Sequence, residues 1–406
     1  MTEANNGGGD TSGLLRIRDP HGHAKVTYVE LFFDLVFVFA ITQLSHSLLH
    51  HFTLAGLAET IFLTLAIWSV WIYTSWVTNW LNPQATVVRL MMFVLMAAGL
   101  VMSASIPDAF GDKGIAFAGA FVFMQVGRSI FMCVCLRGRS PNNYRNFLRI
   151  TAWLIVSGAI WIAGAFAENG ARWALWVAAL LVEAAGPSAG FRTPGLGRSA
   201  TTDWDISPAH MAERCGLFVI IALGESLLVT GATVAELAWT HLTIFTFAVC
   251  FVASVAMWWV YFSIAADDAS EEFARSDDPG RIARLAYTYL HIPLIVGIIL
   301  SAVSDEVILS HPNGHVSFMQ AVAILGGPAI FLVGNLLFKR VLFDEFLRSH
   351  VAGLALLTAL IITIPLQTPL ALAICATGVL LVVGVWENIY AAQWKTANPG
   401  WARGKH

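Results

Sequence analysis

Long apolar runs follow one another along almost the whole chain, and short polar segments separate them. A run of about 20 apolar residues is long enough to cross a bilayer as an α-helix. The pattern therefore predicts an all-α integral membrane protein with about twelve transmembrane helices, of which the sixth and the eleventh are short. The predicted spans are residues 27–49, 55–79, 87–106, 114–136, 146–167, 171–186, 211–234, 240–265, 285–304, 317–338, 350–366 and 369–390.

The first run, VTYVELFFDLVFVFAITQLSHSLLHH, is unusually polar for a membrane helix. Glu30 and Asp34 lie four residues apart, so a helix places both carboxylates on one face, roughly 5 and 11 Å from the start of the span. Thr42 and Gln43 follow on the same run. Because polar side chains are unfavourable in hydrocarbon, we expect this face to look toward protein or water rather than lipid.

The basic residues indicate how the chain is oriented. If the N-terminus is cytoplasmic, nearly all of the 23 Lys and Arg residues fall in cytoplasmic loops or in the adjoining helix turns. Only Lys113 and Arg172 fall on the opposite side, and Arg128 falls inside the fourth span. This distribution is the positive-inside bias of membrane proteins. It predicts a protein of the cell inner membrane with an even number of spans and with both termini in the cytoplasm.

The composition excludes most soluble classes of protein. Hydrophobic residues make up 57% of the chain and charged residues only 12%, whereas soluble proteins carry about 25% charged residues. The five cysteines all lie in apolar runs, which argues against a disulfide framework. No Gly-rich phosphate loop, nucleophile elbow or HExxH motif is present. We expect no cofactor, no bound metal and no nucleic-acid partner. Membrane lipid and an ion or small solute are the expected partners, and an oligomer is compatible with the sequence.

The second half of the chain resembles the first. Matching segments occur in the same order, on helices of equal rank: Val29-Glu30 with Ala212-Glu213, Thr42-Gln43 with Glu225-Ser226, Trp71–Ser75 with Trp259–Ser263, Val126–Arg128 with Val333–Asn335, and Glu183 with Glu387. Chance similarity between apolar helices is the alternative interpretation. Since six is an even number, two six-helix repeats would run parallel to each other.

The domain organisation follows from these repeats. We predict a cytoplasmic N-terminal tail (residues 1–26), a first six-helix repeat (27–186), a cytoplasmic linker (187–210), a second six-helix repeat (211–390) and a cytoplasmic C-terminal tail (391–406).

Two further spans carry polar side chains near the middle of the membrane. Gln125 and Arg128 lie in the fourth span, and Glu225 lies about 20 Å into the seventh. An ionised group at such depth is unfavourable by at least about 2.5–3.5 kcal/mol, so Arg128 needs a partner. Asp34 is the first candidate and Glu225 the second. The pair would be either a structural ion pair or a titratable pair on an ion or proton path.

Small residues and a proline mark two other candidate positions. Gly224 and Ser226 flank Glu225, where they permit either close helix packing or room for an ion or water. His291 lies in the ninth span, close to Pro293. The proline predicts a kink whose freed carbonyl group could bind a ligand or water.

Three segments resemble a known family. VELFFDLVFVFAITQLS (Val29–Ser45), ERCGLFVIIALGES (Glu213–Ser226) and WWVYF (Trp258–Phe262) are similar to signatures of the bacterial low temperature requirement A (LtrA) family. The resemblance implies a multi-pass membrane protein, and it implies no established activity. The first helix also resembles, more distantly, that of the lysosomal potassium channel family. It has Tyr28 where that family has an arginine, and Phe33 where that family has a serine.

Three functions are compatible with these features. The first is an ion or small-solute channel or secondary transporter, with a path between the repeats lined by Glu30, Asp34, Thr42, Gln43, Arg128 and Glu225. The second is an intramembrane enzyme that acts on a lipid or isoprenoid, with Asp34 or Glu225 as general acid; this requires a cavity that opens sideways to lipid. The third is a non-catalytic membrane sensor or scaffold needed at low temperature, in which every buried carboxylate is paired and no cavity exists.

Overall fold

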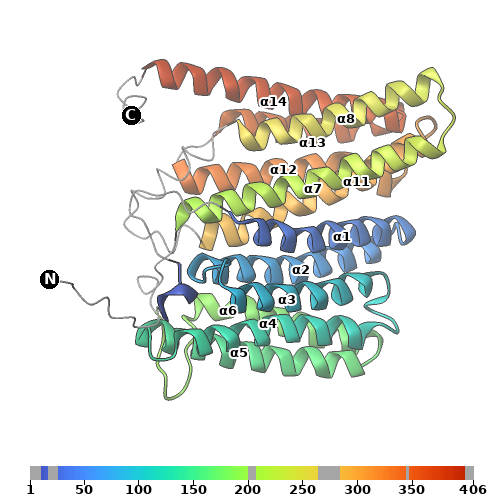
Figure 1. The fold of residues 1–406 in the computed structure, drawn as a ribbon. Coiled ribbons are helices and arrows are strands. Elements are labelled where there is room, and N and C mark those ends of the chain that lie inside the picture. Colours follow the sequence, from blue (N-terminus) through green and yellow to red (C-terminus); the bar gives the residue numbers. More distant parts are fainter. Residues whose placement is uncertain (1–10, 17–25, 200–206, 264–283, 344–346, 398–406) are drawn as a thin grey trace.

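Twelve long α-helices make up most of the part of the chain that the computed structural model describes, which is residues 11–16, 26–199, 207–263, 284–343 and 347–397 (Figure 1). The first half contains α1 (Tyr28–His50), α2 (Leu54–Trp80), α3 (Thr86–Ala104), α4 (Gly114–Leu136), α5 (Pro141–Phe166) and α6 (Asn169–Ser188). The second half contains α7 (Pro208–Glu236), α8 (His241–Phe262), α11 (His291–Ser310), α12 (Phe318–Phe343), α13 (Arg348–Thr363) and α14 (Pro369–Ala397). Short helical turns occur at η1 (Thr11–Leu14), η2 (Ile106–Asp108), η4 (Arg284–Tyr289) and η5 (Ile364–Leu366).

Eleven of the described helices are long and apolar enough to cross a membrane, and the prediction of an all-α integral membrane protein is confirmed. The remaining long helix is α6, whose position agrees with the predicted sixth span. It carries Arg172 and Glu183, and both side chains are buried in the protein. Because neighbouring helices rather than lipid surround these charges, α6 forms although it is less apolar than the other helices.

The first helix shows how the sequence pattern produces the packing. The α1 side chains Phe33, Phe37 and Leu44 are fully or almost fully buried, whereas Phe32 and Leu35 on the opposite face are about half exposed. Exposed apolar side chains of this kind suit the lipid tails around a membrane protein. The polar residues Glu30 and Asp34, by contrast, point into the protein, as the sequence predicts.

The helices lie roughly side by side, and the two halves of the chain meet through α1 and α2 on one side and α7 and α11 on the other (Figure 1). Several neighbour relations occur in both halves. Helix α1 packs on α2 and α3 as α7 packs on α8 and α11, and α4 packs on α3 and α5 as α12 packs on α11 and α13. These shared neighbours are compatible with the two predicted repeats, and the repeat itself stays a prediction.

Two glycines allow α11 and α12 to approach each other closely. A Cβ atom added at Gly297 would lie 2.7 Å from the backbone nitrogen of Phe331, and one added at Gly327 would lie 3.0 Å from the backbone nitrogen of Ser301. Small residues at a helix contact are a common means of packing in membranes, where the hydrophobic effect does not drive helices together.

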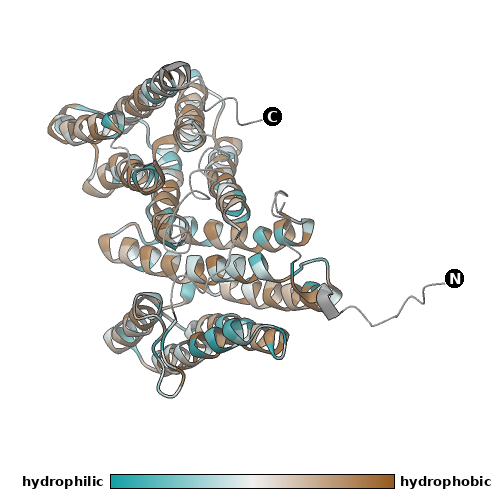
Figure 2. Ribbon diagram, turned by 90° about the vertical axis from the view of Figure 1, so that its left-hand side faces the viewer, coloured by the Kyte–Doolittle hydropathy of each residue, from teal (hydrophilic) through white to brown (hydrophobic). Residues whose placement is uncertain are grey.

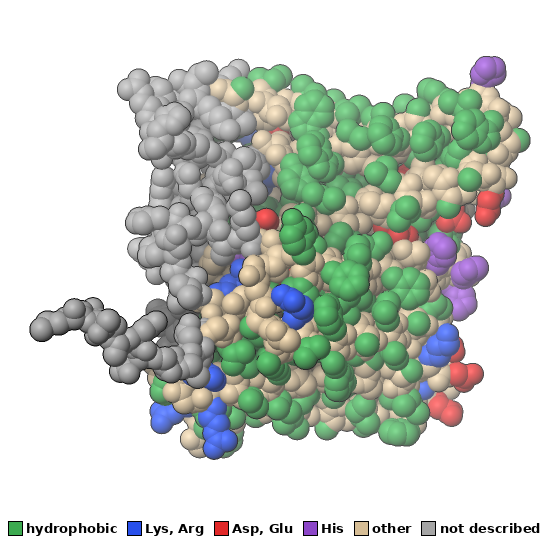
Figure 3. Space-filling model, in the orientation of Figure 1, with side chains coloured by type: hydrophobic (Ala, Val, Ile, Leu, Met, Phe, Trp, Pro, Cys, Tyr) green, Lys and Arg blue, Asp and Glu red, His purple; other side chains and the backbone are tan. Residues whose placement is uncertain are grey.

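The two ends of the helix bundle differ in charge. On the face that Figure 3 shows, Lys and Arg side chains gather mainly at the left end, and His, Asp and Glu side chains gather at the right end. Helix α1 begins at the left end and α14 finishes there, so the first and last helices share an end (Figure 1). Seen along the helix axes, most of the ribbon is hydrophobic (Figure 2). The cytoplasmic location of the left end, and the inner membrane as the site, stay predictions.

Candidate functional site

A buried cluster of charges joins α1, α7 and the segment that precedes α1. Glu30 accepts hydrogen bonds from Arg16 Nη2 at 2.9 Å, from His210 Nε2 at 2.9 Å and from the backbone nitrogen of Thr27 at 2.9 Å. The side chain of Asn79 lies 3.3 Å from the other ring nitrogen of His210, which therefore accepts a hydrogen bond. Every oxygen of Glu30 has a partner, and the Thr27 contact satisfies a backbone group at the start of α1. Glu30 consequently holds this end of the two halves together.

Asp34 lies one turn deeper and is less completely bonded. One carboxylate oxygen, Oδ1, accepts hydrogen bonds from Arg214 Nη2 and from Trp71 Nε1, each at 2.8 Å. Arg214 also donates to Ser75 Oγ at 3.1 Å, and its Nη1 atom lies 4.0 Å from Glu30. Within the described residues, Asp34 Oδ2 and Arg214 Nε and Nη1 have no hydrogen-bond partner although they are buried. Unbonded buried polar atoms are uncommon in proteins and point to a functional role or to a bound water or ion.

A group of four aromatic side chains, here called the aromatic plug, follows Asp34 along the interface. It consists of Phe37 on α1, Trp68 and Trp71 on α2, and Phe218 on α7. The ring centroid of Phe218 lies 4.3 Å from that of Trp71, 5.3 Å from that of Trp68 and 6.3 Å from that of Phe37. All four side chains are almost fully buried. The plug therefore fills the α1–α7 interface beyond Asp34.

The second acid of the interface, Glu225, lies beyond the plug. Its Oε2 atom accepts a hydrogen bond of 2.5 Å from Thr42 Oγ1, and its Oε1 atom has no partner among the described residues. Glu225 is 1% exposed and forms no ion pair in the described part of the chain. Thr42 is eight residues after Asp34, so the two acids lie about 12 Å apart along α1. The different depths predicted for Asp34 in the first span and Glu225 in the seventh agree with this arrangement.

Thr42 and Glu225 are also the positions that the sequence comparison matches between the two halves. They are 183 residues apart, and they contact each other directly. Equivalent residues meet in this way where two repeats face each other across a two-fold axis. A Cβ atom added at Gly224 would meet nothing within 4 Å, so this glycine is not required for close helix packing.

Ser226 lies on a different side of α7 from Glu225. Its hydroxyl group donates to Asp305 Oδ2 at 2.8 Å and lies 3.0 Å from Ser254 Oγ, while Thr230 Oγ1 lies 3.4 Å from the same Asp305 oxygen. These side chains join α7 to α8 and α11. The predicted span 285–304 left Asp305 in an outer loop, and this is wrong because α11 continues to Ser310.

The expected ion pair between Arg128 and Asp34 or Glu225 is wrong. Arg128 donates to the backbone oxygen of Val70 at 3.1 Å, to Thr74 Oγ1 at 2.9 Å and to Gln125 Oε1. Asp34 is bonded by Arg214 instead. The depth of a charge in the membrane does not determine which helix faces it. Helix α4 contacts α2, and the α2 backbone and hydroxyl groups supply the acceptors.

The carboxylate nearest to this arginine in the network is Glu183 on α6. Gln125 Nε2 donates to Glu183 Oε2 at 2.9 Å, so one amide bridges the guanidinium and the carboxylate. Ser157 Oγ and Trp161 Nε1 donate to Glu183 Oε1 at 2.7 and 3.1 Å. Gln125, Arg128 and Glu183 thus form a buried polar network inside the first half of the chain, separate from the α1–α7 interface.

Two other predicted residues occupy different places. His291 begins α11, where its Nδ1 atom lies 2.9 Å from the Ala286 carbonyl oxygen and its Nε2 atom lies 2.8 Å from the Tyr261 hydroxyl. Pro293 lies in the first turn of α11, just after the junction at Leu290 between the π-helical turn η4 and α11, so the predicted span is interrupted beside the proline, and the kink itself stays a prediction. Gln43 is half-buried on α1 and makes no side-chain hydrogen bond with the described residues.

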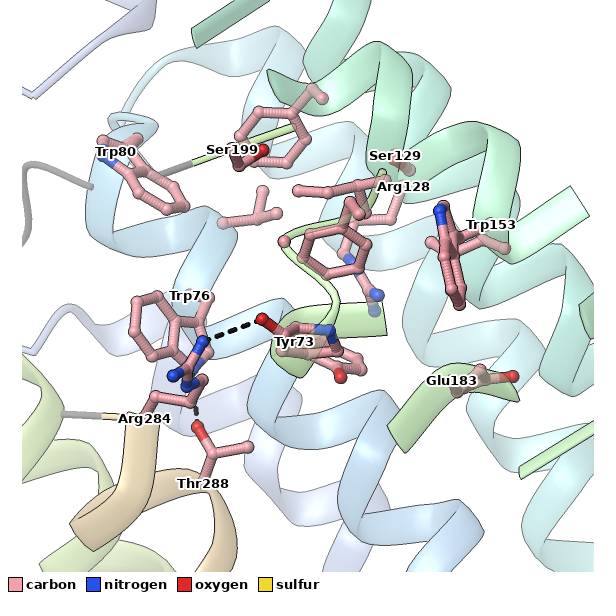
Figure 4. Close-up of a pocket in the computed structure, with 17 residues that line it drawn as sticks. Tyr73, Trp76, Trp80, Arg128, Ser129, Trp153, Glu183, Ser199, Arg284 and Thr288 are labelled. Atoms are coloured by element: carbon pink, nitrogen blue, oxygen red, sulfur yellow. Dashed lines mark hydrogen bonds between the residues drawn. The ribbon is translucent and has the colours of Figure 1, made fainter. Parts of the chain in front are cut away.

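Two cavities border Glu183, and neither is lined by Glu30, Asp34 or Glu225. The first, of about 80 Å³, contains Arg128 and is here called the Arg128 cavity (Figure 4). The second, of about 500 Å³, is a groove between α2, α6 and the start of α11, here called the α2–α6 groove. Tyr73, Glu183 and Thr288 line both.

The comparison with known proteins agrees with the three sequence segments identified above. The model of the bacterial low temperature requirement A protein (LtrA) family matches residues 25–385. The chain belongs to the LtrA family. A relative in Rhizobium meliloti (strain 1021), described as an uncharacterized protein, is 40% identical over 365 residues, which is 90% of this chain and 89% of the relative. No solved structure matches the chain.

Sequence reasoning missed several residues of this LtrA-family protein that the structure brings to the interface. Arg214 lies near the start of the predicted seventh span, and its side chain is fully buried against Asp34. Arg16 and His210 precede the predicted spans, and both bind Glu30. The carboxylates of Glu30 and Asp34 were the sequence signal for these residues, because a buried carboxylate requires basic or polar neighbours.

Proposed function

We propose that this LtrA-family protein transports a small cation, a proton or a monovalent metal ion, along the α1–α7 interface. The proposal rests on one observation. Two carboxylates, Asp34 and Glu225, lie at different depths on the same interface, and each keeps one oxygen atom without a hydrogen-bond partner in the described residues. Ionisable groups inside a membrane protein are unfavourable, and they often mark ion pathways and proton relays.

The charges favour a cation over an anion. The cluster of Arg16, Glu30, Asp34 and Arg214 has two acidic and two basic side chains, with His210 beside them. Among the described residues, Glu225 hydrogen-bonds only to the neutral hydroxyl group of Thr42, and His46 is the basic side chain that acts on it electrostatically without an ion-pair contact. A carboxylate without an ion-pair partner attracts cations, and its affinity rises in a site from which water is excluded. Glu225 is therefore the cation-binding group in this proposal, and Asp34 with Arg214 forms the exchangeable pair at the other end.

The aromatic plug separates the two acids, so the path is closed in this arrangement. Transport would require Phe218 and Phe37 to move apart and connect the two sites. This requirement is consistent with cavities that do not reach Asp34 or Glu225.

The other two functions have weaker support. The α2–α6 groove does offer a sideways opening for an intramembrane enzyme, but the carboxylate that lines it is Glu183 rather than Asp34 or Glu225. A pure scaffold with fully paired acids fits poorly, since Asp34 and Glu225 have unbonded oxygens and cavities are present.

Purified full-length protein in liposomes tests this proposal. Flux of protons and of K⁺ or Na⁺ is measured with pH-sensitive and cation-sensitive dyes under an imposed gradient. We expect flux above that of empty liposomes, and we expect Glu225→Gln and Asp34→Asn to reduce it to the empty-liposome level. Asp305→Asn is the matched control, because Asp305 is also a buried acid bonded to α7, but it lies on α11 and bonds to Ser226 rather than to a residue of α1. Folded Glu225→Gln protein with unchanged flux of every cation would contradict the proposal.

A further inference from the structure

The α2–α6 groove lies in the apolar surface of the first half. It runs along α2 from Ala58 to Tyr73, which is a length of about 22 Å, and α6 forms its other wall from Val177 to Ala184. Val177 and Leu181 are exposed apolar side chains on that wall. The hydrocarbon of one bilayer leaflet is about 15 Å thick, so the groove is long enough for one acyl or isoprenoid chain.

The Arg128 cavity adjoins this groove. Tyr73, Glu183 and Thr288 line both spaces, so the two spaces border the same three side chains. The Arg128 cavity is mostly apolar, and Trp76, Trp80 and Trp153 also line it (Figure 4). Tryptophan side chains prefer the level of the lipid headgroups, because the ring is apolar and its N–H group donates hydrogen bonds.

The Arg128 cavity is lined by two arginines and one carboxylate, Glu183, so one positive charge exceeds the negative charge there. Arg128 is 2% exposed, and all three groups that accept its hydrogen bonds are uncharged. Gln125 bridges Arg128 to Glu183, and three neutral donors bind the two Glu183 oxygens. A second cation, Arg284, lines the same pocket and donates to the Pro187 oxygen at 2.9 Å (Figure 4). A buried guanidinium of this kind is stabilised by an anionic ligand.

We propose that the two adjoining cavities bind one anionic membrane lipid. The phosphate headgroup lies in the Arg128 cavity, within reach of Arg128 and Arg284, and one acyl chain lies in the α2–α6 groove. Arginine binds phosphate through several parallel N–H donors, and basic pockets between membrane helices bind such headgroups. The α2–α6 groove distinguishes a lipid from a free phosphate ion, which would occupy the Arg128 cavity only. This inference does not depend on cation transport along the α1–α7 interface.

The full-length protein, purified in mild detergent and delipidated, provides the test. Binding of phosphatidylglycerol and of phosphatidylcholine is measured by native mass spectrometry, and thermal unfolding is followed with either lipid or with inorganic phosphate. We expect phosphatidylglycerol to bind and to raise the unfolding temperature, whereas phosphatidylcholine and inorganic phosphate have little effect. Arg128→Gln should weaken phosphatidylglycerol binding about tenfold, since one charge-assisted contact is lost.

Matched variants test the headgroup cavity and the acyl-chain groove separately. Ala184→Trp fills the groove and should abolish the preference for phosphatidylglycerol, whereas Ala178→Trp, exposed on the same helix but outside the groove, should not. Arg137→Gln removes an exposed charge at the end of α4 and should also leave binding unchanged. If Arg128→Gln does not fold, Arg284→Gln replaces it as the headgroup variant beside Ala184→Trp. Each of these two variants should then weaken phosphatidylglycerol binding. Equal binding of both lipids, an equal effect of inorganic phosphate, or an Ala184→Trp protein that binds normally would overturn the inference.

Discussion

Replacing Arg214 with methionine tests the buried charge cluster at the α1–α7 interface. Methionine keeps much of the volume of the side chain but removes the guanidinium. Arg214 is completely buried, and it provides one of the two hydrogen bonds to Asp34, at 2.8 Å. In the Arg214→Met protein the Asp34 carboxylate would keep only Trp71 Nε1 as a donor. We therefore expect a marked loss in the free energy of unfolding.

The size of the loss follows from the burial of both partners. Removing one member of a buried ion pair destabilises a protein by about 3–5 kcal/mol, because the remaining charge is left without compensation. Removing both members is much less unfavourable. The double variant Asp34→Asn with Arg214→Met should therefore be more stable than Arg214→Met alone, by about 2 kcal/mol or more. Arg214→Lys keeps the charge, so its free energy of unfolding should lie between those of the wild type and of Arg214→Met.

Unfolding in mixed micelles of mild detergent and dodecyl sulfate measures these differences. Tryptophan fluorescence is a suitable signal, since Trp71 lies 5.5 Å from the guanidinium of Arg214. Arg137→Met, at an exposed position, serves as the control. Strict additivity of the Asp34→Asn and Arg214→Met effects would refute the coupling. So would an Arg214→Met protein that is as stable as the wild type.

Three further predictions concern helix packing and the second half of the chain. Gly297→Ala should reduce the unfolding free energy by about 1–3 kcal/mol, because its Cβ atom would lie 2.7 Å from the Phe331 backbone nitrogen. Gly224→Ala has nothing within 4 Å of the new Cβ, so the same unfolding titration should show no loss, or a gain of up to about 1 kcal/mol. Lys339→Met removes the ion-pair partner of Glu387 and should destabilise by about 3–5 kcal/mol. Adding Glu387→Gln should restore part of that loss. If the double variant loses as much unfolding free energy as the two single variants together, the ion pair does not contribute as expected.

The helices could be predicted from the sequence because a membrane span needs a long apolar run, which is visible without any knowledge of packing. The buried faces of α1 were also predictable. Glu30 and Asp34 could not remain in lipid, so they had to face the protein. The end of α11 was less visible, because Asp305 interrupts the apolar run although the helix continues around it.

The partners of the buried charges could not be predicted. Sequence gives the depth of a residue but not the rotation of its helix or the neighbour it meets. Arg128 and Asp34 have similar requirements for a partner, yet Arg128 faces α2 acceptors and Asp34 faces Arg214. Arg16 and His210 lie outside the predicted spans, so a search within the membrane could not find them. The Thr42–Glu225 contact, however, agrees with the match between the two halves of the chain.

Opening the aromatic plug tests the proposed path most directly. Phe218 contacts Phe37, Trp68 and Trp71, so Phe218→Ala removes the ring at the centre of the plug. Cation flux is measured in liposomes for the wild type, for Phe218→Ala and for Phe218→Ala combined with Glu225→Gln. The account predicts higher flux through Phe218→Ala than through the wild type, and a return to the empty-liposome level when Glu225→Gln is added. A folded Phe218→Ala protein with unchanged flux, or a leak that persists in the combined variant, would contradict it.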